Sequence, residues 1–73
     1  MDDALSRLED VLDGIAQGAN AVVDKHQLDE TGTWVVELRH VDGDWSVVAE
    51  GDTKAKALSN LIANAKAEGR APS

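Results

Sequence analysis

The two histidines have the most obvious capacity for chemistry, since imidazole binds metals and exchanges protons near neutral pH. They are His26 and His40, and acids stand near both; Asp42 and Asp44 follow His40 at alternate positions. A metal site needs two or three such ligands at set distances, and fourteen acids among 73 residues make acidic neighbours common by chance. We interpret His26 as a helix-end residue and His40 as a strand residue that packs beside Trp45, and we predict no metal site.

The segment Asp42-Gly43-Asp44 has a partial likeness to a calcium-binding loop. An EF-hand loop needs further oxygen ligands at set positions and a Glu that ends a loop of about twelve residues. The sequence lacks these residues. Asp-Gly between two apolar segments instead favours a two-residue type I′ turn, in which both central residues need a positive φ. We therefore predict that residues 42–43 close a β-hairpin.

Nothing in the sequence has the pattern of a catalytic centre. The chain has no cysteine, which excludes thiol nucleophiles, thiolate metal sites and disulfides. Its serines have no Gly-x-Ser-x-Gly elbow and no adjacent base. The acids of the first helix are expected on its solvated face, away from any apolar pocket suited to acid catalysis. The residues considered are Ser6, Ser46, Ser59, Glu9, Asp10, Asp13 and Asp24. We predict a protein that is not an enzyme, without catalytic residues or cofactor.

The charge balance is strongly acidic, because seven Lys and Arg stand against fourteen Asp and Glu and give a net charge of −7. Such a chain repels phosphate backbones, so we do not expect it to bind nucleic acid. Four basic residues near the C-terminus could contact nucleic acid, but no aromatic residues lie between them. They are Lys54, Lys56, Lys66 and Arg70.

Nine of the acids are Asp and only four residues are Lys. This composition resembles that of the acidic proteins of salt-in halophiles such as haloarchaea, and the alternative is an ordinary acidic protein. No apolar run approaches the roughly 18 residues that a membrane-spanning helix needs. The first residues, Met1-Asp2-Asp3, are acidic where a secretory signal is basic. We expect a soluble cytoplasmic protein that makes no membrane contact.

The elements that carry these side chains follow from apolar spacing. Apolar positions recur at intervals of three and four through the first third of the chain, which predicts a helix over residues 3–26. Gly14 and Gly18 lie inside it, and each costs about 1 kcal/mol relative to Ala. We therefore expect any break in this helix near Gly18. The apolar stripe comprises Leu5, Leu8, Leu12, Ile15, Ala19, Val22 and His26.

Residues 33–40 and 45–50 are rich in β-branched and aromatic residues and predict the two strands of the hairpin. The turn sets a register that pairs Leu38 with Val47, Val36 with Ala49, and His40 with Trp45. One face of the hairpin is then apolar and carries Trp34, Val36, Leu38, Trp45, Val47 and Ala49. The other face is polar and carries Glu37, Arg39, Ser46 and Glu50, together with Val35 and Val48.

A second helix is predicted over residues 53–68, capped by Thr53 and ended by Gly69. Its buried stripe comprises Leu58, Leu61, Ile62 and Ala65. Residues 70–73 are expected to form a mobile tail. The sequence thus predicts one small α+β domain over residues 1–73, in the order helix, strand, strand, helix, with both helices on one face of the antiparallel hairpin.

Such a hairpin leaves two strand edges unpaired, and an isolated hairpin is marginal in water. Val35 and Val48 also lie outside the apolar face. We therefore predict a homodimer, formed by sheet extension or through the first helix, with the monomer as the alternative. The leading interpretation is a small non-enzymatic protein that acts through surfaces, with a second, unknown protein partner left open.

The segment Asp42–Leu58 resembles the strand-to-helix portion of HicB-like antitoxins. That family carries a Gly-Asp-Thr turn, here Gly51-Asp52-Thr53, before a helix with an Ala-Leu pair, here Ala57-Leu58. The chain lacks the family's loop with Pro and Gly between the strands, and its N-terminal helix is foreign to the family's pattern. The resemblance implies an antitoxin that neutralises a small toxin. This role and that of a nucleic-acid accessory protein are the two alternative functions.

Overall fold

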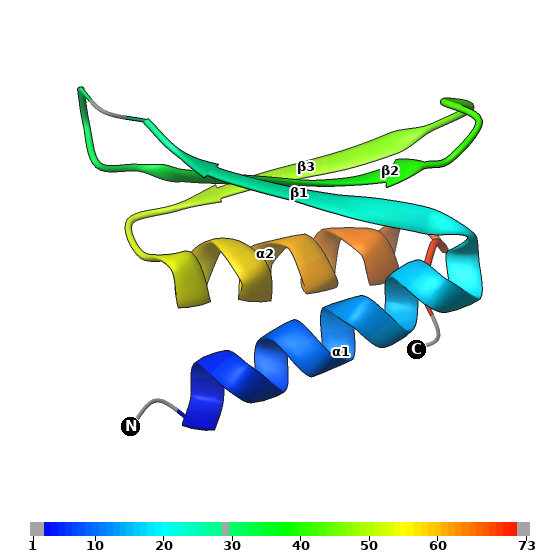
Figure 1. Ribbon diagram of the computed structural model, residues 1–73, viewed down its shortest axis with the longest axis horizontal. Coiled ribbons are helices and arrows are strands. Elements are labelled where there is room, and N and C mark those ends of the chain that lie inside the picture. Colours follow the sequence, from blue (N-terminus) through cyan, green and yellow to red (C-terminus); the bar gives the residue numbers. More distant parts are fainter. Residues whose placement is uncertain (1–2, 29, 72–73) are drawn as a thin grey trace.

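The computed structural model describes residues 3–28 and 30–71 as two helices and one antiparallel sheet. The sheet has three strands in the order β1-β2-β3, so β2 is central and β1 and β3 are edges. Both helices cover the same face of the sheet (Figure 1). The elements are α1 (Asp3–Ala19), β1 (Ala21–Gln27), β2 (Trp34–His40), β3 (Ser46–Gly51) and α2 (Lys54–Ala67). The α+β class and the shared helix face are as predicted, but the sheet has one strand more than the predicted hairpin.

The extra strand replaces the last part of the predicted helix over residues 3–26. The helix ends at Ala19, and Asn20 adopts a left-handed backbone conformation with φ of 56°. Asn tolerates this region better than other non-glycine residues, so it turns the chain sharply. Residues 21–27 then form β1, because Val22 and Val23 are β-branched and favour an extended backbone. The break lies just beyond Gly18, near the place expected.

The register predicted for the β2–β3 hairpin is confirmed. Leu38 lies opposite Val47 and Val36 opposite Ala49. The N–H of His40 donates to the carbonyl of Trp45 over 3.1 Å, and the two rings are 5.7 Å apart.

The predicted type I′ turn is wrong, because Gly43 has a positive φ of 77° but Asp42 does not. Between the paired residues His40 and Trp45 the chain forms a four-residue loop, Val41–Asp44, in which the Gly43 N–H donates to the His40 carbonyl over 2.8 Å. The register survives because the loop is still centred between residues 42 and 43.

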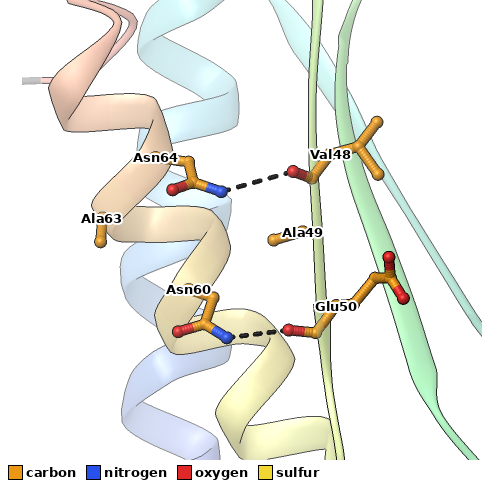
Figure 2. A pocket seen from close by; sticks show the side chains of 6 residues that line it. All are labelled: Val48, Ala49, Glu50, Asn60, Ala63 and Asn64. Atoms are coloured by element: carbon orange, nitrogen blue, oxygen red, sulfur yellow. Dashed lines mark hydrogen bonds between the residues drawn. The ribbon is translucent and has the colours of Figure 1, made fainter.

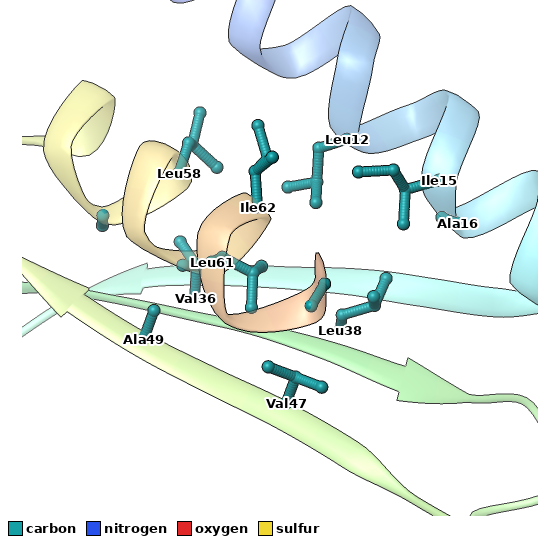
Figure 3. Close-up of a cluster of buried hydrophobic side chains, with 12 residues drawn as sticks. Leu12, Ile15, Ala16, Val36, Leu38, Val47, Ala49, Leu58, Leu61 and Ile62 are labelled. Carbon is teal, nitrogen blue, oxygen red and sulfur yellow. The ribbon is translucent and has the colours of Figure 1, made fainter. Parts of the chain in front are cut away.

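The core lies between the sheet and the helices (Figure 3). Every residue of the predicted apolar face points into it, with the valines, the leucine and the alanine buried and the two tryptophans half-buried at opposite ends. Each tryptophan is covered by a cation: the Lys54 ammonium lies 5.7 Å from the Trp34 ring, and the Arg70 guanidinium 4.5 Å from the Trp45 ring. The core comprises Leu12, Ile15, Ala16, Val36, Leu38, Val47, Ala49, Ala57, Leu58, Leu61, Ile62 and Ala65.

The second helix has the predicted cap and buried stripe. The Thr53 hydroxyl accepts a hydrogen bond from the Lys56 N–H over 3.1 Å, and Gly69 follows the helix with φ of 73°. Beyond it, Arg70 donates its N–H to the Ala65 carbonyl over 2.8 Å, and Ala71 packs against the core. The rest of the predicted mobile tail, residues 72–73, lies outside the described residues.

Gly51 allows the end of β3 to approach the first turn of α2. A Cβ atom added at Gly51 would lie only 2.5 Å from the backbone nitrogen of Ala57. Gly14 and Gly18 are different, since a Cβ atom at either position meets nothing within 4 Å. The close approach that fixes α2 against the sheet therefore depends on Gly51 and on neither glycine of α1.

Candidate functional site

The free edge of β3 is covered by two asparagines of α2 (Figure 2). The side-chain amide of Asn60 donates to the Glu50 carbonyl over 2.8 Å, and that of Asn64 donates to the Val48 carbonyl over 3.4 Å. The two asparagines are four positions apart, so they lie one helical turn apart on one side of α2. Two outward-facing carbonyls of an edge strand are thereby satisfied within the chain.

An open hollow of about 400 Å³ lies between this edge and α2. The surface around it is mainly polar, and the side-chain amides of Asn60 and Asn64 project into it (Figure 2). The residues around it are Val48, Ala49, Glu50, Asn60, Ala63 and Asn64. Its one ionisable lining residue is Glu50, which is exposed, and the hollow has the character of a helix-covered sheet edge.

The free edge of β1 has no such cover. The Leu28 N–H donates to the Thr33 carbonyl over 2.8 Å, which places the backbone groups of Leu28 toward β2. Because the direction alternates along an antiparallel strand, the N–H and C=O groups of residues 21, 23, 25 and 27 point away from β2. Among residues 3–28 and 30–71, no hydrogen bond reaches these outward groups. The two edges of the sheet are therefore unequal: two outward carbonyls of β3 accept side-chain amides, whereas the outward groups of β1 have no partner within the described residues.

The side chains of β1 are exposed on both faces of the strand near its end. Lys25, His26 and Gln27 are all exposed, and Val22 is 41% exposed. Lys25 points to the helix side, where its ammonium lies 3.5 Å from the Glu9 carboxylate of α1. α1 slants away from the sheet toward its N-terminus (Figure 1). A partner strand would meet little obstruction from side chains here.

The face of the sheet opposite the helices is uncovered and mixed in character (Figure 1). As predicted, Val35 and Val48 lie there, and Val48 is 51% exposed. They are separated from Val22 by charged side chains, of which Asp24 and Arg39 form an ion pair over 3.2 Å. This face is therefore not a continuous apolar patch, and the strand edge is the better candidate for binding.

His40, Asp42 and Asp44 form the one group of metal-ligand type within the described residues, and their ligand atoms lie within 4.8 Å of one another. The Asp42 N–H donates to His40 Nδ1 over 3.2 Å, and an Asp44 oxygen lies 3.8 Å from the same nitrogen. The imidazole nitrogen nearest the acids is thus engaged by the hairpin loop. This arrangement stabilises the loop, in agreement with the interpretation of His40 as a strand residue beside Trp45.

The positions predicted for His26 and Asp24 are wrong. Both were expected on the first helix, His26 at its end, and both lie on the outer face of β1 because the helix stops at Ala19. Glu9 does lie on α1, where it contacts Lys25 and also the Lys54 ammonium, at 3.8 Å. The predicted acids of α1 therefore include one that links the helix to both β1 and α2.

The other residues considered for catalysis are scattered over the surface. Ser6, Ser46 and Ser59 are exposed and lie on three different elements. Asp10 and Asp13 are exposed on α1. The structure brings none of them together with a histidine in the described part of the chain.

Comparison with protein-family models, with curated proteins and with solved structures finds no match for this chain. In residues 3–28 and 30–71, neither helix has the length and apolar character needed to cross a bilayer.

Proposed function

We propose that the protein is a non-enzymatic interaction module that acts as a homodimer. The observation that carries this proposal is the open edge of β1, a seven-residue strand whose outward N–H and C=O groups have no partner within residues 3–28 and 30–71. An unpaired edge is a template for another strand. A domain of 73 residues has a small core, and a partner surface adds buried area that the core alone does not supply.

A role in binding nucleic acid is less well supported. Of the four bases near the C-terminus, Lys54 contacts Glu9 and lies over Trp34, and Arg70 lies over Trp45. These cations are engaged within the chain, and the net charge of −7 repels phosphates. Nucleic-acid binding is therefore an alternative outcome of the experiment below.

An antitoxin would use an open edge to hold a different chain. The segment 42–58 forms the end of the hairpin loop, β3 and the start of α2, which agrees with the strand-to-helix unit of HicB-like antitoxins. Any strand followed by a capped helix has the same form, so this agreement does not favour an antitoxin over a homodimer. Capture of a small basic toxin is the second alternative outcome.

The acidic composition also supports a proposal about the compartment in which the protein acts. An excess of Asp over Lys suits a cytoplasm with molar salt, where the Debye length is about 3 Å and self-repulsion is screened. The homodimer is therefore proposed to form in the cytoplasm of a salt-accumulating cell. Measurements of assembly belong in molar KCl.

Sedimentation equilibrium in molar KCl tests the proposal. We expect a mass that rises with concentration from the chain mass of 7.7 kDa toward twice that value. A constant mass of 7.7 kDa at the highest concentration, with intact helical circular dichroism, would contradict it. Affinity capture from native lysate at native salt tests the alternatives, since a retained small basic protein favours the antitoxin role and retained RNA or DNA the accessory role.

A further inference from the structure

The outer face of β1, together with Leu28 directly after the strand, carries a pattern that is complementary to itself. The Leu28 N–H donates to the Thr33 carbonyl and continues the pairing by one residue. Along that face the order is therefore Val22, Asp24, His26, Leu28: apolar, acidic, imidazole, apolar. Val22 and Leu28 are each 41% exposed. When a strand with this pattern pairs antiparallel with its own copy, apolar residues meet apolar residues and acids meet imidazoles. We infer that two copies of the chain pair through β1 about a two-fold axis at Lys25, and so form a continuous six-stranded sheet. This inference rests on the proposed homodimer.

The choice of edge follows from the cover on the other one. Asn60 and Asn64 occupy the outward carbonyls of Glu50 and Val48, and α2 lies beside them. A second copy that paired through β3 would have to displace both amides. At β1 the outward groups of residues 21, 23, 25 and 27 have no hydrogen bond in the described part of the chain. Sheet extension through β1 therefore breaks no existing bond.

The choice of register follows from charge and from the alternation of the ladder. An axis at Asp24 would place the two Asp24 carboxylates opposite each other. An axis at Val23 would place Asp24 of each copy opposite Val22 of the other. An axis at His26 would place the imidazole opposite itself. With the axis at Lys25, Asp24 of each copy faces His26 of the other, and Val22 faces Leu28. These are non-hydrogen-bonded pairs, in which opposite side chains approach more closely.

Lys25 is the residue that opposes this pairing. Inward-facing charges on edge strands keep chains apart in many proteins, and the proposed axis brings the two Lys25 side chains together. Each ammonium lies 3.5 Å from Glu9, which draws it toward α1 and away from the edge. Molar salt screens the remaining repulsion, because the Debye length is then only about 3 Å. The dimer should therefore strengthen with salt.

The expected dimer is weak. A seven-residue edge gives about six backbone hydrogen bonds between the copies. Two short strand edges are expected to bury less than the roughly 1,200 Å² at which standard stable interfaces begin. Assembly should therefore depend on concentration, with monomer and dimer in fast exchange.

Charge exchange across the interface is the test, made on the full chain by sedimentation equilibrium in molar KCl. His26→Asp places an acid opposite Asp24 twice, so we expect a dissociation constant roughly tenfold higher. The double variant Asp24→His with His26→Asp restores both pairs and should return the constant to within roughly threefold of the original value. Val48→Lys lies on the outer face of the other edge strand and is the matched control, for which no change is expected. Circular dichroism verifies that each variant is folded.

The outcomes separate this inference from the proposed function. Pairing through β1 is overturned if His26→Asp leaves the dissociation constant of the dimer unchanged. It is also overturned if the double variant is folded but does not restore that constant. A dimer lost with Val48→Lys and retained with His26→Asp assigns assembly to the β3 side, and only the present inference fails. A parent chain that is monomeric at every concentration overturns the homodimer itself. Should His26→Asp unfold the chain, His26→Gln removes the imidazole without adding a charge and is expected to weaken the dimer by roughly threefold.

Discussion

The side-chain amide of Asn60 donates a hydrogen bond to the backbone carbonyl of Glu50 over 2.8 Å, across the edge of the sheet. Together with Asn64, one turn further along α2, it satisfies two carbonyls that an edge strand would otherwise leave open. Natural proteins cover or charge their exposed edges because an open edge recruits other chains. The two edges of this sheet therefore differ in their capacity to recruit another strand.

Replacing Asn60 with Ala should uncover the β3 edge. We expect a loss of about 1 kcal/mol in the free energy of unfolding, the usual worth of one such hydrogen bond. We also expect more self-association, since a second edge becomes available. Urea unfolding followed by circular dichroism measures the first effect and light scattering the second. Ser59→Ala, at the exposed neighbouring position of α2, is the control: it should leave self-association unchanged and raise the stability by at most about 0.5 kcal/mol through the helix propensity of Ala.

Gly51→Ala should destabilise the fold, because its Cβ would lie 2.5 Å from the Ala57 backbone nitrogen. Relieving that overlap requires α2 to shift on the sheet, at a cost of about 1–3 kcal/mol. Gly14→Ala makes the same chemical change in open space within α1 and should stabilise by up to about 1 kcal/mol. Urea midpoints that move in the same direction for both variants would show that the close approach at Gly51 is not required.

Asn20 sets the change from α1 to β1. Its φ of 56° lies in the left-handed region, which a β-branched side chain disfavours by about 1–2 kcal/mol. Asn20→Val should therefore lower the free energy of unfolding by that amount, while Asn20→Gly should leave it within about 0.5 kcal/mol. Chemical denaturation of the two variants checks the difference. Equal stabilities would indicate that the helix continues past this residue.

Salt should raise the melting temperature steeply between dilute and molar KCl. The net charge of −7 destabilises the compact chain by self-repulsion, and added salt screens it. Neutralising an exposed acid, as in Asp10→Asn, should raise the melting temperature in dilute buffer and have little effect in molar KCl. Differential scanning calorimetry provides the measurement. A melting temperature that is flat across this range would contradict the proposed action in a salt-accumulating cell.

Much of the fold was predictable because it depends on local pattern. The β2–β3 register follows from alternation around a short loop, and α2 follows from its cap at Thr53 and its apolar stripe. β1 was missed because Ala19, Val22 and His26 continue the helical spacing of α1 by coincidence. Two residues favour the observed change from helix to strand: Asn20 tolerates a left-handed backbone, and Val23 is a second β-branched residue directly after Val22.

The candidate interaction surface was predictable only in outline. Unpaired edges follow from any small sheet, so sheet extension was an expectation from the sequence. The position of α2 beside β3 decides which edge is open. Asn60 and Asn64 reach the carbonyls of β3 only because α2 lies there, and the sequence alone does not show this. The complementary pattern of β1 was hidden as well, because Asp24 and His26 share a face only in a strand.

Amide hydrogen exchange in molar KCl, compared between dilute and concentrated protein, shows at which strand edge two copies of the chain pair. Pairing through β1 predicts that the amides of Val23, Lys25 and Gln27 become protected as the concentration rises, because their N–H groups point to the open edge. The amides of Val48 and Glu50, on the covered edge, should exchange at unchanged rates. Protection that grows at Val48 and Glu50, or at none of the five amides, would contradict the account.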